Sequence, residues 1–468
     1  MQTAIDMRSR LVRGLRPTAV RRATRLRLVL LGTATAVLAS ACAGAGALGT
    51  SSNTVVVAIV SNPQMQDAIS LSKAFEKDHP GTRLKFVSLP ENEARAKITA
   101  SVATSGGEFD AVMISNYETP QWARNGWLVN LQPYIDKTPG YDAQDFIPSI
   151  RKALSYRGDM FSVPFYGESS FLAYRKDLFA KAGLTMPTHP TWPQVRSFAA
   201  KLDDPKHGVT GICLRGLPGW GENLAPLDTV INTFGGRWFD MRWHARLDSP
   251  QVHKAVKFYI DTLRRYGEPG AAAAGFSECV TRYSQGQAAM WYDATSMVST
   301  VESKTDSKVV GKSGYAFAPV VKTKHSGWLY SWSLGIPKSA GNKDGAWQFL
   351  SWVTSKQYIK LVGSRLGWAR VPPGSRLSTY RLPQYAKIAK AYARPTLDAL
   401  KFADPQHPTV KPVPYTGIQF VGIPEFQDLG TRVSQQISAA IAGQISVDQA
   451  LSQSQLYAES VGESYQKG

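Results

Sequence analysis

The chain has 468 residues, of which 43% are hydrophobic. That length is too great for one compact core, so we expect two or three lobes. The formal charge is +19, but eight arginines and one acid, Asp6, precede residue 28. The rest of the chain has 46 bases and 34 acids, a net charge of +12, and contains no single basic run. This distribution argues against nucleic-acid binding.

The N-terminal segment has the pattern of an export signal. Its arginines lead into an apolar run at 28–39, followed by Ser40, Ala41 and Cys42. That run is shorter than the roughly 20 residues of a membrane-spanning helix. We expect a signal peptide at 1–41, lipidation of Cys42 as in a bacterial lipobox, and a small-residue tether at 42–52. Ala39 stands where that motif usually has leucine, and an uncleaved signal anchor is the alternative.

Two further cysteines, Cys213 and Cys279, follow in the main part of the chain. An exported domain of this size does not need a disulfide framework. The sequence does not show whether their Cα atoms lie close enough to pair, so the pairing is left open.

The next segments alternate between two kinds of pattern. Runs rich in β-branched or apolar residues predict strands at 54–60, 83–89, 110–114 and 160–166. Apolar residues at helical spacing predict helices at 67–78, 91–103, 192–202, 250–266, 345–353, 357–362 and 427–442, with a turn and helix at 174–183. Strands that alternate with helices are typical of parallel β-α-β units, so we expect an α/β fold.

The order of residues from Val163 to Trp192 resembles a known family. Val-Pro-Phe-Tyr-Gly-Glu-Ser-Ser is followed by Tyr-Arg-Lys-Asp-Leu-Phe-Ala-Lys-Ala-Gly-Leu, as in the extracellular solute-binding proteins of carbohydrate ABC importers, and most closely in their sorbitol/mannitol branch. Further stretches carry the same resemblance at 108–110, 116–120, 211–216, 219–223, 290–295, 328–333, 367–374, 412–417 and 424–427.

The resemblance implies a two-lobed periplasmic-binding-protein fold, type II-like, with the ligand in a cleft between the lobes. One lobe would take residues 52–164 and 317–350. The other would take residues 165–316 and 351–468. The resemblance also implies capture of a polyol, with a monosaccharide or a disaccharide as the alternative ligand.

A polyol site needs charged groups that form directional hydrogen bonds with hydroxyls. The candidate carboxylates are Glu91, Glu118, Glu168, Glu222 and Asp293, most of them in expected loops after strands, where ligand contacts of α/β domains concentrate. Each could instead be a solvated charge or a helix cap. Arg215 and Arg370 are candidate donors, with a salt bridge to a nearby acid as the alternative role.

Aromatic faces would cover the C–H surface of such a ligand. The candidate tryptophans are Trp220, Trp291, Trp328, Trp332 and Trp368, and the candidate tyrosines are Tyr117, Tyr166 and Tyr415. Core packing is the alternative for each. Trp347 and Trp352 fall within a helix pattern and are assigned to the core.

Three common enzyme motifs are absent from the sequence. The chain contains no HExxH pair and no G-x-S-x-G elbow, and Asp306 stands where a phosphate-binding loop ending at Gly311-Lys-Ser313 would need glycine. We expect no catalysis, no organic cofactor and no metal. A secreted carbohydrate-active hydrolase with two catalytic carboxylates stays open as an alternative.

The expected partners are a small polyol or sugar and the permease subunits of an importer whose ATPase is a separate chain. We expect a monomer held by its lipid at the outer face of the cytoplasmic membrane, with no nucleic-acid partner.

Overall fold

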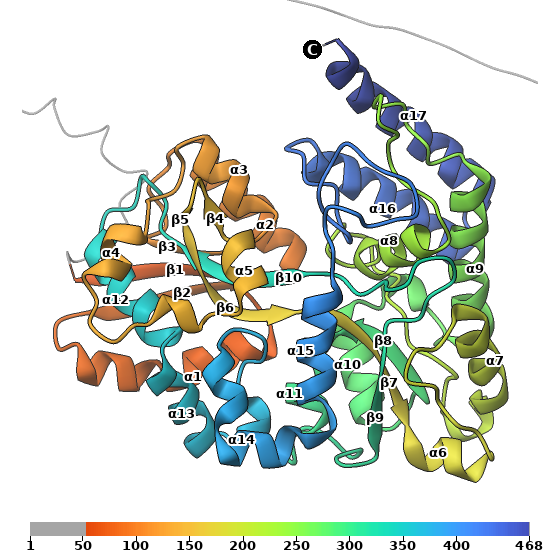
Figure 1. The fold of residues 1–468 in the computed structure, drawn as a ribbon, viewed down its shortest axis with the longest axis horizontal. Coiled ribbons are helices and arrows are strands. Elements are labelled where there is room, and N and C mark those ends of the chain that lie inside the picture. The colour runs from red at the N-terminus through yellow and green to blue at the C-terminus, as the bar shows by residue number, and fades with distance from the viewer. Residues whose placement is uncertain (1–52, 468) are drawn as a thin grey trace, which may run out of the picture. The chain divides into compact units, whose positions relative to one another are not determined.

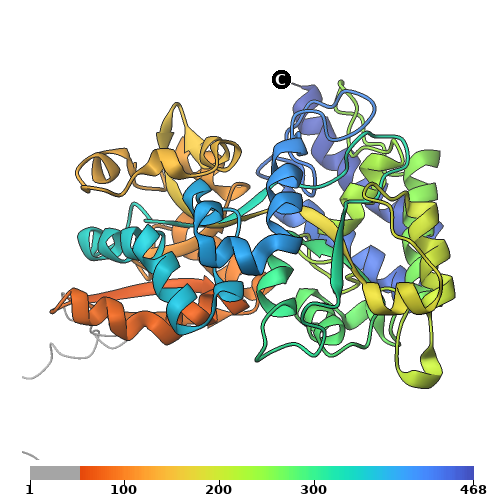
Figure 2. The ribbon, with the colours of Figure 1, turned by 60° about the horizontal axis from the view of Figure 1, so that its bottom comes forward.

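The computed structural model describes residues 53–467, which fall within one compact unit of the chain. Cys42 and the expected signal peptide lie outside these residues. Two sheets, each with its own helices, form two lobes that lie side by side in both ribbon views (Figure 1, Figure 2). Within the described range, none of the helices has the length and apolarity that crossing a bilayer requires.

The first lobe contains a five-stranded sheet with the strand order β2-β1-β3-β10-β6. Its strands are β1 (Thr54–Val60), β2 (Arg83–Leu89), β3 (Ala111–Ser115), β6 (Ser162–Glu168) and β10 (Tyr330–Gly335). β1 pairs in parallel with β2 and β3, as the alternating pattern predicts, while β10 runs antiparallel to β3 and β6. A short hairpin, β4 (Ser155–Tyr156) and β5 (Asp159–Met160), precedes β6.

The second lobe contains a three-stranded sheet with the order β8-β7-β9. Its strands are β7 (Ser170–Arg175), β8 (Met290–Ala294) and β9 (Ser313–Phe317), and both pairings are antiparallel. β8 is completely buried, because this sheet lies beneath the helices of its lobe. The parallel β-α-β prediction therefore describes the start of the first lobe and not the second.

The chain passes between the sheets at two places. β6 ends at Glu168 in the first sheet and β7 begins at Ser170 in the second, so strand structure extends beyond the predicted end at residue 166 and continues on both sides of Ser169. The return crossing lies between β9 and β10. The lobe boundaries drawn from the resemblance stay predictions.

Several helices begin where a side chain can satisfy the free backbone N–H groups of the first turn. Asn62 accepts a hydrogen bond from Met65 N at the start of the first helix, so this helix begins at Pro63, before the predicted residue 67. Thr191 and Gln194 form a reciprocal capping box at the start of the predicted helix 192–202.

The helices of the first lobe and its margin are α1 (Pro63–Asp78), α2 (Glu91–Ala103), α3 (Glu118–Arg124), α4 (Gln132–Asp136), α5 (Pro148–Ala153), α12 (Lys343–Val353), α13 (Lys356–Arg365) and α14 (Pro383–Ile388). Those of the second lobe and the crossing region are α6 (Lys176–Lys181), α7 (Trp192–Leu202), α8 (Leu224–Thr233), α9 (Pro250–Tyr266), α10 (Phe276–Ser284), α11 (Val298–Val301), α15 (Ala393–Phe402), α16 (Phe426–Ala442) and α17 (Val447–Gln466).

Candidate functional site

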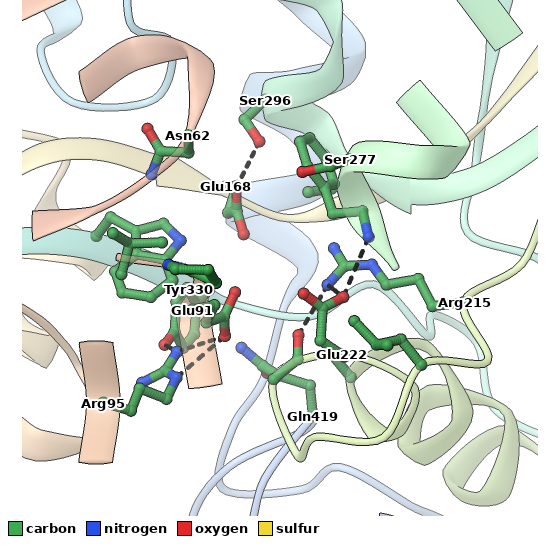
Figure 3. Close-up of a pocket in the computed structure, with 18 of the residues that line it drawn as sticks. Asn62, Glu91, Arg95, Glu168, Arg215, Glu222, Ser277, Ser296, Tyr330 and Gln419 are labelled. Atoms are coloured by element: carbon green, nitrogen blue, oxygen red, sulfur yellow. Dashed lines mark hydrogen bonds and ion pairs between the residues drawn. The ribbon is translucent and has the colours of Figure 1, made fainter. Parts of the chain in front are cut away.

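A cavity of about 300 Å³ is lined by residues of both lobes. The first lobe contributes the residues just after β1, the first turn of α2, and inward side chains of β6 and β10. The second lobe contributes the loop before α8, the start of α10 and the residues that follow β8. Figure 3 shows polar side chains from these segments facing one another. Ligand sites of α/β domains commonly lie at such strand ends.

Eight of the predicted residues line the cavity: Glu91, Tyr166, Glu168, Arg215, Trp220, Glu222, Trp328 and Trp332. The sequence did not identify several polar lining residues, including Ser61, Asn62, Arg95, Ser277, Glu278, Ser296, Tyr330 and Gln419. Tyr330 lies within the family-like stretch 328–333, a signal that could have found it. Arg95 and Gln419 have no comparable local signal.

Glu168 closes one side of the cavity at the end of β6 (Figure 3). Its Oε2 accepts a 2.6 Å hydrogen bond from the Ser296 hydroxyl, and burial raises the pKa of its carboxyl to about 8. Desolvation disfavours the charged form, so this carboxyl carries a proton during much of the time at neutral pH and can then donate to a ligand as well as accept.

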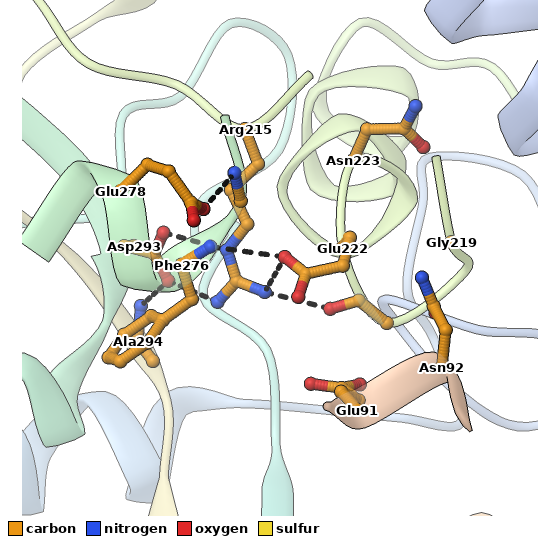
Figure 4. Close-up of polar contacts among 12 residues, drawn as sticks. Glu91, Asn92, Arg215, Gly219, Glu222, Asn223, Phe276, Glu278, Asp293 and Ala294 are labelled. Atoms are coloured by element: carbon orange, nitrogen blue, oxygen red, sulfur yellow. Dashed lines mark hydrogen bonds and ion pairs between the residues drawn. The ribbon is translucent and has the colours of Figure 1, made fainter. Parts of the chain in front are cut away.

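Arg215 faces the cavity from the second lobe and is held by Asp293. Its Nε and Nη2 donate to the two Asp293 carboxylate oxygens at 2.8 and 2.5 Å, and its Nη1 donates to Gly221 O at 2.7 Å. Figure 4 shows this fork together with Glu222. A bidentate pair orients a guanidinium strongly, so Asp293 positions Arg215 without lining the cavity itself.

Glu222 lies next to this pair. Its Oε2 accepts from Phe276 N at 3.1 Å and forms a 3.4 Å ion pair with Arg215 Nη1. Burial raises the pKa of Glu222 to about 7, while the nearby Arg215 charge opposes the increase. The guanidinium of Arg215 offers donors, and the carboxyls of Glu168 and Glu222 offer acceptors, for adjacent hydroxyls of a ligand.

Arg95 lines the cavity although no pattern in the sequence predicted it. Its Nε and Nη2 donate to Glu91 Oε1 at 3.0 and 2.9 Å, and its Nη1 donates to Glu118 Oε1 at 2.6 Å. The guanidinium carbon lies 4.1 Å from the ring centre of Trp220 and 4.6 Å from that of Trp332. Cation–π contacts of this kind stabilise a buried guanidinium, so Arg95 joins a carboxylate pair to two of the predicted aromatic residues.

The structure places seven predicted residues outside the cavity lining: Tyr117, Glu118, Trp291, Asp293, Trp368, Arg370 and Tyr415. The first four lie directly behind lining residues. Tyr117 packs against the Trp220 ring and donates to Ile423 O, and Glu118 accepts from Arg95. Trp291 donates to Asp293 Oδ2 at 3.1 Å. Their own polar atoms are thus engaged by protein partners.

The other three lie farther along the chain in different contacts. Trp368 packs beside Gly363 of α13. Arg370 pairs with Asp67 of α1 and with Asp306, which is the salt-bridge alternative for that residue. The Tyr415 hydroxyl accepts from Trp238 N at 3.1 Å.

Cys213 and Cys279 form a disulfide with a Cα–Cα distance of 5.7 Å. The sequence alone did not determine whether these two cysteines pair. Both cysteines are completely buried and neither lines the cavity. The bridge joins the segment before Arg215 to α10, so it holds together two segments that carry lining residues. Since both thiols are consumed, these cysteines are not metal ligands in this state.

The chain is similar to several known proteins. Residues 62–360 match the family model described as bacterial extracellular solute-binding protein. A mannitol-binding protein of Pseudomonas aeruginosa is 48% identical over 421 residues, which cover 90% of this chain and 95% of that protein. An ABC transporter solute-binding protein from Agrobacterium vitis S4, solved with bound D-mannitol, superposes with a TM-score of 0.86 at 46% identity over 88% of this chain and 99% of that one.

A second solved structure extends the comparison. A solute-binding protein from Agrobacterium radiobacter K84 in complex with ribitol has a TM-score of 0.76 at 25% identity, and covers 87% of this chain and 98% of its own.

Proposed function

We propose that this chain, which belongs to the bacterial extracellular solute-binding protein family, captures a linear polyol such as mannitol for import by an ABC transporter. The observation that carries the proposal is the cavity of about 300 Å³, lined by carboxylates, a fixed guanidinium and aromatic rings. The similarity to the mannitol-binding protein and to the mannitol and ribitol complexes supports the same ligand class.

The size of the cavity favours a small ligand. Its volume lies at the lower end of the range of about 300–1,000 Å³ for ligand pockets, which suits one polyol or monosaccharide better than a disaccharide. Its acceptor Glu168 ends β6 of the first lobe, whereas its acceptor Glu222 and its donor Arg215 lie in the loop before α8 of the second lobe. Hydroxyls along an extended chain could reach all three, and a ligand that lacks one of them would leave a buried group unpaired at a cost of about 1–3 kcal/mol.

The importer cycle requires ligand-dependent closure of the lobes. A ligand shifts that equilibrium only through its higher affinity for the closed form. Contacts with both lobes supply that difference, since Glu168 belongs to β6 of the first lobe and Arg215 to the second. The liganded protein would then dock on the permease subunits as a monomer.

A thermal-shift screen of the mature chain, without residues 1–42, tests the ligand class. At 100 times its dissociation constant a ligand stabilises by about 2.7 kcal/mol, which raises the midpoint by several degrees. We expect a shift with D-mannitol, D-sorbitol, D-arabinitol or ribitol and none with maltose. Glu222→Gln should reduce it, whereas Glu463→Gln, an exposed position on α17, should not.

Two other results would change the proposal. A shift with pyranoses alone would keep the transport role and replace the polyol with a monosaccharide. No shift with any of these ligands, together with turnover of a chromogenic glycoside, would favour the hydrolase alternative.

We also propose that Cys42 carries the lipid that retains the protein at the outer face of the cytoplasmic membrane. Dual acylation anchors a protein far more firmly than a single chain. Cys42→Ser should release the protein from the membrane fraction, and mass spectrometry of the wild-type N-terminus should find the acylated cysteine. Membrane retention of the Cys42→Ser protein at its full uncleaved mass would favour the signal-anchor alternative.

A further inference from the structure

The acids around the cavity outnumber the bases. Arg95 is shared by Glu91 and Glu118, and Arg215 is shared by Asp293 and Glu222. Each guanidinium therefore faces two carboxylates. The four acids leave an excess of negative charge before Glu168 is counted, and a neutral polyol does not compensate that excess.

Glu168 is a buried acid of the cavity wall without a basic partner at ion-pair distance among the described residues. The Ser296 hydroxyl is its hydrogen-bond donor, and within residues 53–467 no lysine, arginine or histidine forms an ion pair with it. Its side chain is part of the cavity wall, and the residue is 6% exposed. In Figure 3 its carboxylate points into the space between the two lobes. A buried acid in this position is either neutral or in need of a cation.

We propose that the cleft also takes amino alditols, which are linear polyols with a protonated amine in place of one terminal hydroxyl, and that the ammonium group pairs with Glu168. This inference rests on the proposed polyol function, because the remaining hydroxyls would use the same donors and acceptors. It assigns a cationic end to the ligand site, at the Glu168 side of the cavity.

Desolvation and charge both favour Glu168 as the partner of the ammonium group. The Glu168 carboxyl is already removed from bulk water by the fold, so the ammonium group is the one that loses its hydration shell on binding. The carboxyl of Glu168 must release its proton to form this pair, and a nearby ammonium charge favours that release because an opposite charge lowers the pKa of an acid. Charge-assisted hydrogen bonds are roughly twice as strong as neutral ones.

The opposite side of the cavity is less suited to an ammonium group. The acids on that side are paired with Arg95 and Arg215, so an ammonium group there would compete with a guanidinium that is already in place. A terminal amine is therefore expected to take one orientation, with its charged end at Glu168 and its hydroxyls toward Arg215.

Isothermal titration calorimetry with a matched pair of ligands tests the inference. D-Mannitol and 1-amino-1-deoxy-D-mannitol differ only at one terminal group. At pH 8 we expect the amine to bind the mature protein at least threefold more tightly than mannitol. Equal or weaker binding of the amine, with mannitol bound, would overturn the inference and leave the proposed function intact. Binding of neither ligand would instead contradict the proposed function.

Two variants locate the ammonium group. The amine-to-alcohol affinity ratio should fall at least threefold in Glu168→Gln and stay at its wild-type value in Glu222→Gln, although both variants weaken both ligands. A ratio that survives Glu168→Gln would overturn the assignment. If Glu168→Gln does not fold, the wild-type titrations are repeated at pH 6. The ratio should fall there, because a protonated Glu168 does not pair with an ammonium group, and an unchanged ratio would count against the inference.

Discussion

The side-chain amide of Asn92 donates a 2.9 Å hydrogen bond to the carbonyl oxygen of Pro218. Asn92 stands in the first turn of α2 in the first lobe, and Pro218 belongs to the loop 216–222 of the second lobe, which we call the glycine loop. A Cβ atom at Gly219, where φ is +145°, would lie 2.4 Å from Asn92 Oδ1. The two lobes thus approach each other closely at Asn92 and Gly219 (Figure 4). A side chain at Gly219 would push the two lobes apart.

Gly221→Ala should weaken ligand binding. A Cβ there would lie 1.9 Å from Glu91 Oε1, so the alanine must displace Glu91 from Arg95. We expect about tenfold weaker mannitol binding by calorimetry, equivalent to about 1.4 kcal/mol. Gly341→Ala is the matched control, because its Cβ would meet its nearest neighbour at 3.7 Å. Equal affinities of the two variants would show that the close approach is not needed for binding.

The stability of the unliganded protein should fall as pH rises from about 5 to 8. Burial raises the pKa of Glu168 to about 8, so the folded state binds a proton that the unfolded state releases near pH 4.5. Stability from this group is complete at low pH and is lost as pH rises toward 8, by up to about 1.4 kcal/mol per pH unit. Urea denaturation at several pH values should show a shallower decline in Glu168→Gln. An identical slope in the variant would mean that Glu168 stays ionised.

Loss of the Cys213–Cys279 disulfide should reduce stability without abolishing binding. The bridge spans 66 residues of sequence, for which the chain-entropy model gives about 4 kcal/mol. We expect the Cys213→Ala/Cys279→Ala protein to unfold at lower urea concentration and to keep mannitol affinity within about threefold, because neither cysteine lines the cavity. A reductant should destabilise the wild type and leave the variant unchanged. A larger loss of affinity would show that the bridge positions Arg215.

Arg95→Lys should be costly although it keeps the charge. One ammonium group cannot reproduce the contacts of the guanidinium with Glu91, with Glu118 and with two indole rings. We expect a loss of about 3 kcal/mol in the free energy of unfolding and weaker mannitol binding. Arg432→Lys is the control, because its pair with Asp428 is exposed and such pairs contribute little. Comparable urea midpoints for the two variants would contradict this role of Arg95.

Local patterns in the sequence determined many of the elements. The strands at 54–60 and 83–89 and the helices at 91–103, 192–202 and 250–266 have the predicted bounds, because β-branched runs, caps and helical periodicity act within a few positions. The family-like stretches also identified Glu168, Arg215 and Glu222, which line the cavity. Glu168 was expected in a loop, yet it ends β6, since strand pairing with β10 extends past Gly167.

Tertiary structure alone decided which polar residues meet. Arg95 stands in a helix whose sequence resembles a surface helix, and it is 5% exposed because Trp220 and Trp332 cover it from distant parts of the chain. The sequence predicted Asp293 and Arg215 as two separate ligand contacts. In the structure they form one ion pair with each other. Sequence periodicity reports which side of an element is buried, whereas the partner that a charge finds depends on how distant segments pack.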